Sequence, residues 1–378
     1  MKIAHIITKL ELGGAQQNTL FTCRNLPGEK FETFLISGPG GILDEEALDL
    51  NPCFVEELVR EVSPVKDFTA LMKMISILRE LRPDIVHTHS SKAGILGRWA
   101  AWFAGVPVIL HTFHGFGFNP EQNPLVRNFF IFLEKITALI TDAFVFVSGN
   151  NREQAGRLRL GDPAKYHLIH SGIVLHPWET GFRPDAEREK MGIEREERVV
   201  GTVSCFKPQK APLDFVEIAA KVKLEIPKVK FIFIGDGELR PLIEKRIEEL
   251  GMKDDFFLLG WRRDVHKIVP LFDVFLLTSL WEGLPRAILE AFWSEVPAVA
   301  SRVDGNAEIV TEGEDGYLVP VHNIDQFAEK VLMILGNPDI RRKMGKQGRK
   351  KIRGDFDIKI MAERLARLYT KLCSSKNT

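Results

Sequence analysis

The chain reads VFLLTSLWEGLPRAILEA from Val274 to Ala291. It begins with an apolar run, Val274–Thr278, that does not alternate with polar residues, which is typical of a strand covered on both faces in a parallel sheet. A loop follows, and Pro285 suits the first turn of a helix, where its missing N–H removes no hydrogen bond. The stretch therefore predicts strand, loop and helix in succession, the repeating unit of a parallel α/β fold.

The same alternation continues on both sides of this stretch. Before it, the predicted strands are Ile3–Thr8, Thr33–Ser37, Asp84–Thr88, Val108–Thr112 and Ala143–Val147, with helices at Ala15–Leu26 and Phe68–Leu81. A second array has strands at Val199–Ser204, Lys230–Ile234, Phe256–Leu259 and Ala298–Ser301, with a helix at Pro212–Leu224. The polar segment Ser171–Glu197 separates the two arrays.

We therefore predict an α/β protein with two doubly wound, Rossmann-like domains that face each other across a cleft. The predicted domains are residues 1–177 and 178–355. An amphipathic helix near Ile358–Cys373 can pack on either domain, and we assign residues 356–378 to the first.

Composition and charge exclude several classes of protein. The 378 residues carry 51 basic and 51 acidic side chains, without the basic excess of a general nucleic-acid binder. The four cysteines are far apart in the sequence, which fits neither a zinc site nor a disulfide framework and suits a cytoplasmic protein. The amino terminus is too polar for a signal peptide. Charged residues interrupt the most apolar stretch, Asn128–Val147, so we expect no membrane span.

Ligands of doubly wound sheets bind beyond the carboxyl ends of the strands, so the loops there are candidate sites. Gly13 and Gly14 follow the first predicted strand, where they allow a phosphate to approach the helix N-terminus. A tight turn would explain them equally well. The loop is not a GxGxxG fingerprint, and no acidic residue follows the second strand to bind a ribose. A nicotinamide enzyme is therefore disfavoured.

Histidines follow two further strands, in HTHSSK from His87 and HTFHGF from His111. Such side chains can bind metals, transfer protons or contact sugar hydroxyls. For His87 and His111 we favour burial in the sheet with hydrogen bonds to the backbone. For His114, which precedes Gly115, we favour ligand binding. A metal site is disfavoured because no carboxylate accompanies the histidines at zinc-like spacing.

Charged residues follow two strands of the second array. Lys210 stands just before a helix, where an ammonium and free backbone N–H groups can neutralise a phosphate together; a solvated surface lysine is the alternative. Glu282 lies in a loop and Glu290 on the following helix. Eight residues of helix span about 12 Å, the reach from a sugar ring to a ribose. The structural alternative for Glu290 is an ion pair with an arginine.

Together these segments resemble the retaining GT-B glycosyltransferases of family 4 (glycosyl transferases group 1). The resemblance covers nearly the whole chain, and it is carried by the order and spacing of the motifs. They are Gly13-Gly14, PDIVHTH from Pro83, Phe113-His114-Gly115, Lys210, IGDG from Ile234, LGW from Leu259, the pair Glu282 and Glu290, and DGYLV from Asp315.

The resemblance implies a role for each matched residue. Glu290 would hold the donor ribose, and Glu282 and His114 would lie against the transferred sugar. Lys210 would bind the diphosphate, with the Gly13-Gly14 loop beside it. Further donor contacts would come from Gly237, Trp261, Gly283 and Leu284, with the base held by the loop after Gly260. The family usually has an arginine where this chain has Cys205, and Lys207 is close enough in sequence to supply the missing charge.

The implied reaction moves a hexose-type sugar from a nucleotide sugar, with a UDP-sugar favoured. Such transfer passes through an oxocarbenium-like transition state, and Lys210 with the helix N-termini would stabilise the charge on the leaving diphosphate. No nucleophile is apparent among the motifs. We therefore predict attack of the acceptor on the same face, with retention of configuration and without a metal or other cofactor.

The acceptor and two rival functions remain to be distinguished. The segment His89–Gly94 resembles members that build bacterial surface polysaccharides such as lipopolysaccharide, which favours a glycan or polyprenyl-linked acceptor. The aromatic segment Arg127–Leu133 either contacts the inner face of the plasma membrane or packs into the first domain. A sugar-nucleotide epimerase shares the architecture. The second rival is a non-catalytic sugar-nucleotide-binding protein. It is favoured by Cys205, which stands where the family usually has a charged arginine.

Overall fold

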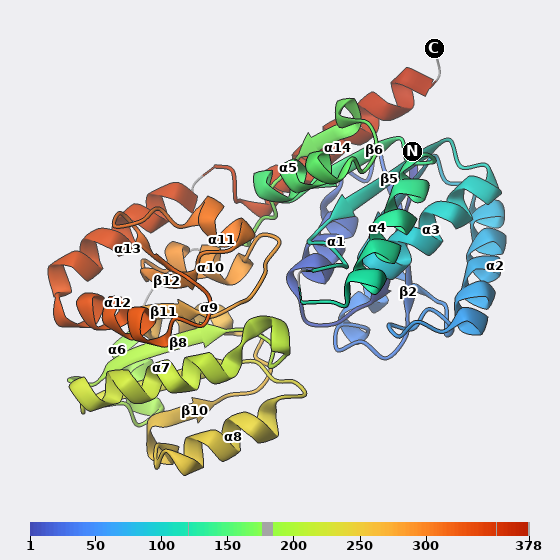
Figure 1. The fold of residues 1–378 in the computed structure, drawn as a ribbon. Coiled ribbons are helices and arrows are strands. Elements are labelled where there is room, and N and C mark those ends of the chain that lie inside the picture. The colour runs from blue at the N-terminus through green and yellow to red at the C-terminus, as the bar shows by residue number, and fades with distance from the viewer. Residues whose placement is uncertain (120, 176–183, 353, 377–378) are drawn as a thin grey trace. The chain divides into compact units, whose positions relative to one another are not determined.

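The chain folds into two compact units in the computed structural model, which describes residues 1–119, 121–175, 184–352 and 354–376. The first unit comprises Met1–Gly172 with Ile358–Thr378, and the second comprises Ile173–Asp357. The predicted boundary between Pro177 and Trp178 lies outside the described residues. In Figure 1 the last helix, drawn in red, accordingly belongs to the unit of blue and green elements.

The first unit is built on a seven-stranded parallel sheet. In spatial order its strands are β3 (Cys53–Phe54), β2 (Glu32–Gly38), β1 (Lys2–Lys9), β4 (Ile85–His89), β5 (Val108–Phe113), β6 (Ala143–Phe146) and β7 (Tyr166–Leu168). Its helices are α1 (Gly14–Asn25), α2 (Pro64–Leu81), α3 (Ser91–Ala104), α4 (Pro124–Ala138), α5 (Gly149–Leu158) and α14 (Ile358–Lys376), with short 3-10 turns η1 (Glu45–Leu50) and η2 (Pro163–Lys165).

Alternate residues of these strands face opposite helix layers, as the two-residue period of a strand requires. Ile3, Ile85 and Leu110 belong to a buried cluster that includes α14, whereas Ala4 and Val86 pack with α2 and α3. The continuous apolar strands thus have both faces covered. The α14 side of the sheet is also the side of His5, His87 and His89.

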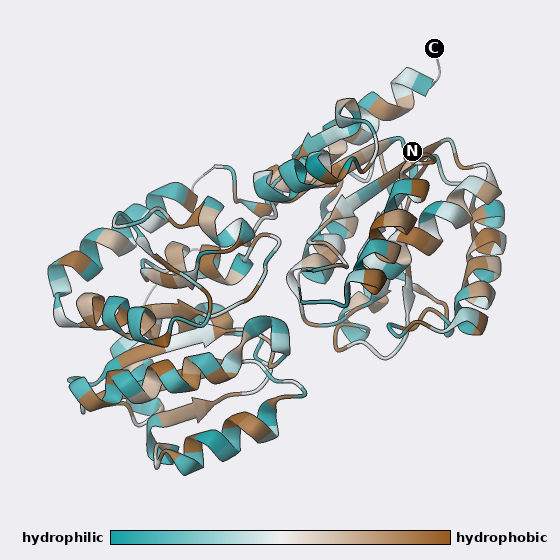
Figure 2. Ribbon diagram, viewed as in Figure 1, coloured by the Kyte–Doolittle hydropathy of each residue, from teal (hydrophilic) through white to brown (hydrophobic). Residues whose placement is uncertain are grey.

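The second unit is built on a six-stranded parallel sheet. In spatial order its strands are β10 (Phe256–Leu258), β9 (Val229–Ile234), β8 (Arg198–Val203), β11 (Val274–Leu277), β12 (Ala298–Ser301) and β13 (Gly316–Val319). Its helices are α6 (Pro184–Lys190), α7 (Pro212–Glu225), α8 (Arg240–Glu249), α9 (Val265–Ile268), α10 (Arg286–Trp293), α11 (Asp304–Ile309), α12 (Ile324–Gly336) and α13 (Pro338–Ile352), with turns η3 (Pro208–Lys210), η4 (Lys253–Asp255) and η5 (Val269–Leu271). Figure 2 shows its strands mainly in brown to tan, whereas its helices mix teal with brown.

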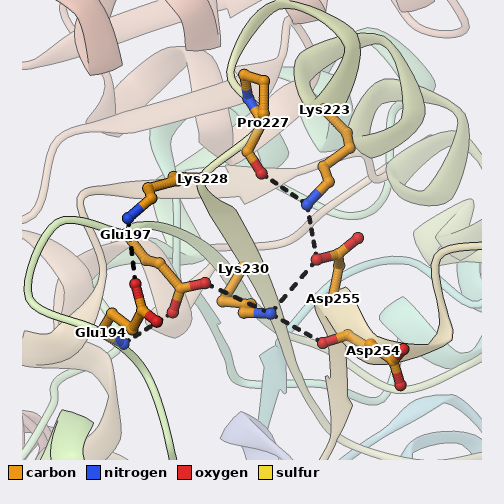
Figure 3. A network of polar contacts seen from close by, with 8 residues as sticks. All are labelled: Glu194, Glu197, Lys223, Pro227, Lys228, Lys230, Asp254 and Asp255. Carbon is orange, nitrogen blue, oxygen red and sulfur yellow. Dashed lines mark hydrogen bonds and ion pairs between the residues drawn. The ribbon is translucent and has the colours of Figure 1, made fainter.

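Charged side chains at the amino edge of this second sheet neutralise one another. Lys230 at the start of β9 lies 3.4 Å from carboxylates of both Glu197 and Asp255, and Lys223 of α7 lies 2.7 Å from Asp255 (Figure 3). Each of these ammonium groups is thus paired with a carboxylate, and we assign this edge to stabilising the fold.

The structure confirms the predicted α/β class. Two local predictions, for the segment between the domains and for the start of the helix at Pro285, were wrong. The segment predicted as a polar connection, Ser171–Glu197, contains helix α6. Pro285 is the N-cap of α10, one residue outside the helix, so that only Arg286 onward is helical and the Glu282–Glu290 spacing is part loop and part helix. Among the described residues, no helix is long and apolar enough to cross a bilayer.

Candidate active site

In the second unit, the loops after β8 and β11 are held together by hydrogen bonds. The Thr278 hydroxyl donates to the carbonyl of Lys210 at 2.8 Å. The Gln209 side chain donates to the Trp281 carbonyl at 2.9 Å, and the Leu280 N–H donates back to the Gln209 carbonyl at 2.8 Å. These bonds bring the two loops, which are far apart in sequence, to one place at the carboxyl edge of the sheet.

Lys210 and Glu282 meet at this place as an ion pair. Lys210 Nζ lies 2.5 Å from Glu282 Oε1, and their side chains are only 18% and 7% exposed. The Ser279 hydroxyl donates to the same Oε1 at 2.6 Å. Burial disfavours the charged ammonium, but the Glu282 carboxylate and Cys205 together outweigh it, and the pKa of Lys210 is raised. Lys210 is therefore a fixed cation, and not the solvated surface lysine considered above.

Close backbone packing fixes the loop that carries Glu282. The Glu282 N–H donates to Asp304 at 3.3 Å. A Cβ added to Gly305 would lie 2.0 Å from the Gly283 carbonyl oxygen, so that the two backbones touch where α11 begins. Leu284 is 8% exposed. Gly283 and Leu284 thus lie between Glu282 and the N-terminus of α10, where partial positive charge favours an anion.

Glu290 lies one turn into α10 and its side chain is 31% exposed. Arg286 stands four residues earlier, with Nη2 3.9 Å from Glu290 Oε1. Burial raises the pKa of Glu290, and the Arg286 charge only partly opposes this shift. The arginine partner considered as an alternative is thus present at long range, and the carboxylate also remains partly accessible.

Glycines close the neighbouring loop after β9. Gly235 and Gly237 have φ of +137° and +155°, and a Cβ on Gly235 would lie 1.9 Å from the Ser204 carbonyl oxygen. The Gly235 N–H donates to the Gly260 carbonyl at 2.9 Å, and Trp261 beside it is 39% exposed. The loops after β8, β9 and β10 therefore share one edge with Lys210.

In the first unit, four histidines come together from β1, β4 and the residue that follows β5. His5 of β1 is paired opposite His87 of β4, and His89 lies on the same face two residues later. His5 Nδ1 lies 3.1 Å from His89 Nε2, and His89 Nδ1 lies 3.1 Å from Nε2 of His114, which follows β5. His89, which belongs to the HTHSSK motif, and His5, which we did not single out from the sequence, thus connect His114 to the core.

His87 and His111 are buried, as expected. Both hydrogen-bond to hydroxyl groups, and His111 also interacts with the backbone of Thr88. His87 shares hydrogen bonds of 2.6 Å with the hydroxyls of Tyr369 on α14 and Thr112. His111 shares one of 2.8 Å with Thr88.

Burial keeps these imidazoles neutral. It lowers the pKa of His5 to about 3 and the pKa values of His87, His89 and His111 well below the usual range. Nitrogens of His5, His87 and His89 lie within 4.8 Å of one another, near enough to consider a shared metal ion. Both His87 nitrogens already bond to hydroxyls, however, so a metal would have to replace a hydrogen bond.

The glycine loop lies at the start of α1. The helix begins at Gly14, and Gly13 is an extended N-cap with φ −152° that any residue could adopt. A Cβ on Gly13 would meet only the flexible end of Gln16, at 2.8 Å. The fold therefore tolerates a side chain here, and the glycine leaves space beside the helix N-terminus.

Comparison with known proteins identifies relatives over the whole chain. Residues 12–176 match the family model described as Glycosyltransferase Family 4, and residues 184–351 match Glycosyl transferases group 1. The chain is 35% identical, over 100% of its length and 98% of the relative, to UDP-Gal:alpha-D-GlcNAc-diphosphoundecaprenol alpha-1,3-galactosyltransferase of Escherichia coli. It is 26% identical to N-acetyl-alpha-D-glucosaminyl L-malate synthase of Bacillus anthracis, over 83% of this chain and 82% of the relative.

A solved structure has the same fold. The HepE protein of Anabaena in complex with UDP-glucose superposes with a TM-score of 0.83 at 18% identity, over 98% of this chain and 100% of that one. The GT-B architecture of two Rossmann-like domains is thus shared over the full length.

Proposed function

The chain belongs to glycosyltransferase family 4, and on this premise we propose that it transfers a hexose-type sugar from a UDP-sugar to a glycan or polyprenyl-linked acceptor in cell-surface polysaccharide synthesis. The observation that carries the activity is the Lys210–Glu282 pair at the carboxyl edge of the second sheet. The donor and acceptor classes are supported by the name of the Escherichia coli relative, and the donor also by the UDP-glucose complex.

The second unit supplies the donor site in this proposal. The ammonium of Lys210 neutralises the diphosphate as negative charge develops on the leaving group, and the N-terminus of α10 near Gly283 and Leu284 adds its dipole. Glu282 lies against the sugar and Glu290 accepts hydrogen bonds from the ribose hydroxyls. Trp261 and Gly237 line the base side, and Lys207 replaces the charge absent at Cys205. These cations and dipoles make a metal unnecessary.

The reaction proceeds with retention in this proposal. The bond from the anomeric carbon to the diphosphate oxygen breaks and the acceptor oxygen bonds to that carbon on the same face, while the acceptor proton passes to the departing phosphate. The anomeric configuration of the product, read by proton NMR, tests this account. An inverted product, or a covalent glycosyl-enzyme trapped during turnover, would contradict it.

The epimerase and binding-protein alternatives are separated by one incubation. With a nucleotide sugar and no acceptor, an epimerase produces a second nucleotide sugar, whereas a glycosyltransferase releases only the nucleotide and free sugar, slowly. A binding protein does neither. Chromatography of the nucleotide products distinguishes the three.

The first unit supplies the acceptor side, and we propose that α4 contacts the cytoplasmic face of the membrane. Leu125, Phe129 and Phe132 recur at four- and three-residue spacing and are 81%, 56% and 57% exposed. On the other side of α4, Glu134 forms a buried 2.6 Å ion pair with Arg98 of α3. The helix is thus both packed on the unit, as one reading expected, and apolar on its outer face.

Vesicle binding tests this contact. Each phenyl ring that enters the lipid contributes up to about 1.5–3 kcal/mol, so the Phe129→Ser/Phe132→Ser variant should lose most cosedimentation with phosphatidylglycerol vesicles. Leu224 of α7, which is 82% exposed in the other unit, provides the matched control as Leu224→Ser. Equal binding of both variants and wild type would refute the contact.

A further inference from the structure

His5, His89 and His114 form a chain of imidazoles that leads from the core to the end of β5. Two hydrogen bonds of 3.1 Å join them, from His5 Nδ1 to His89 Nε2 and from His89 Nδ1 to His114 Nε2. His5 is fully buried and His89 is 4% exposed. Burial keeps the pKa values of both well below the usual range, so each carries a single ring proton.

A chain of neutral imidazoles has only two proton arrangements. With His114 neutral as well, each ring has one N–H and one bare nitrogen, and each hydrogen bond needs one of each. If His114 donates from Nε2, then His89 must donate from Nε2 to His5, and the proton of His5 stands on its own Nε2. If His5 donates from Nδ1 instead, all three protons stand on Nδ1. The tautomer of His114 is therefore coupled to that of His5.

The inner end of the chain distinguishes these arrangements. His5 Nε2 is buried and has no hydrogen-bond partner among the described residues. In the first arrangement this atom would be a buried N–H without an acceptor, which is rarer in proteins than an acceptor without a donor. The second arrangement leaves only a bare nitrogen there.

We propose that the chain is ordered from His5 outward, so that His5 and His89 hold His114 as the tautomer with its proton on Nδ1. His5 and His89 are then positioning residues, and the Nε2 lone pair of His114 is occupied by the proton of His89. Resting on the proposed function, this makes His114 a hydrogen-bond donor to an oxygen of the transferred sugar and not a base for the acceptor. The acceptor proton must therefore go elsewhere, as it does in same-face attack assisted by the departing phosphate.

Histidine-selective ¹⁵N NMR of the full wild-type chain tests the order directly. Two-bond proton–nitrogen correlations show which ring nitrogen carries the proton, and His5→Phe and His89→Gln identify the signals. We expect Nδ1 protonation at His5, His89 and His114. Protonation at Nε2 of His89 or His114, or a metal bound at one equivalent, would overturn the proposal. This readout needs no turnover, so a protein that transfers no sugar would refute the proposed function and leave the order still decidable.

Kinetics test the positioning role. His5→Phe removes the inner donor and should lower kcat about tenfold, as loss of an outer partner does for metal-bound histidines, with donor KM within about twofold. His5→Asn offers an amide donor near the Nδ1 position and should recover most of the loss. Thr88→Val, which removes a buried 2.8 Å bond to His111 on the opposite face of the same sheet, is the matched control and should keep kcat. Equal kcat for His5→Phe and Thr88→Val would overturn the role.

Discussion

The Lys210–Glu282 ion pair should contribute both to the stability of the second unit and to turnover, and a double-mutant cycle separates these two contributions. The perturbation is the cycle of Lys210→Met, Glu282→Gln and the double variant. The 2.5 Å pair is 18% and 7% exposed, so Lys210→Met leaves a nearly buried carboxylate without its cation. The double variant leaves an apolar chain beside a neutral amide of similar shape.

The magnitude follows from this burial. Breaking a fully buried ion pair by removing one partner costs about 3–5 kcal/mol. Lys210 keeps some exposure and Ser279 still donates to Glu282, so we expect about 2–3 kcal/mol for Lys210→Met. For a domain of this size that lowers the Tm by roughly 5–10 °C. The double variant should return to within about 1 kcal/mol of wild type, since neither charge is left buried alone.

Turnover should not recover with stability. Without the Lys210 charge at the leaving group, both Lys210→Met and the double variant should lose donor turnover by about 10²-fold or more, the usual cost of removing one preorganised electrostatic contact. Circular dichroism during heating and a nucleotide-release assay measure the two effects on the same samples. A double variant as unstable as Lys210→Met, or one that regains turnover with its stability, would refute the reasoning.

Three further outcomes are expected. Burial raises the pKa of Glu290, so as the pH falls this carboxylate should become protonated at a higher pH than an ordinary glutamate, and donor KM should rise there. Glu290→Gln should flatten that pH profile of KM. An unchanged profile in Glu290→Gln would count against a ribose role. Lys207→Ala should raise donor KM about tenfold whereas exposed Lys221→Ala should not; equal KM values would leave the charge lost at Cys205 unreplaced. Gly235→Ala, with its Cβ 1.9 Å from the Ser204 carbonyl at φ +137°, should lower urea stability by about 2 kcal/mol or more, and wild-type stability would contradict that contact.

The strands and the main helices could be predicted because their apolar pattern is local. Continuous runs such as Val108–Thr112 are buried on both faces, and nearly the same bounds are found in β5. Lys210 and Glu282 could each be named as a candidate from its place after a strand, and their roles stay predictions. Their pairing could not, because it depends on how the loops after β8 and β11 meet across the sheet.

Only part of the histidine chain could be predicted from the sequence. The two-residue spacing of His87 and His89 predicts a shared face, and the same rule applied to β1 would have placed His5 on one sheet face or the other. Which face, and opposite which residue, depends on the register of β1 against β4. Tyr369, the hydrogen-bond partner of His87, lies on a helix 282 residues away in sequence, and no local pattern indicates that contact.

Donor selectivity tests the central claim most directly. Wild type and Glu290→Ala would be incubated with a panel of nucleotide sugars, and binding and hydrolysis of each donor measured. We expect wild type to bind and slowly hydrolyse one UDP-sugar selectively, and Glu290→Ala to lose both. Failure of wild type to bind any nucleotide sugar would contradict the account. The absence of an arginine at Cys205 would then be the decisive departure from the family.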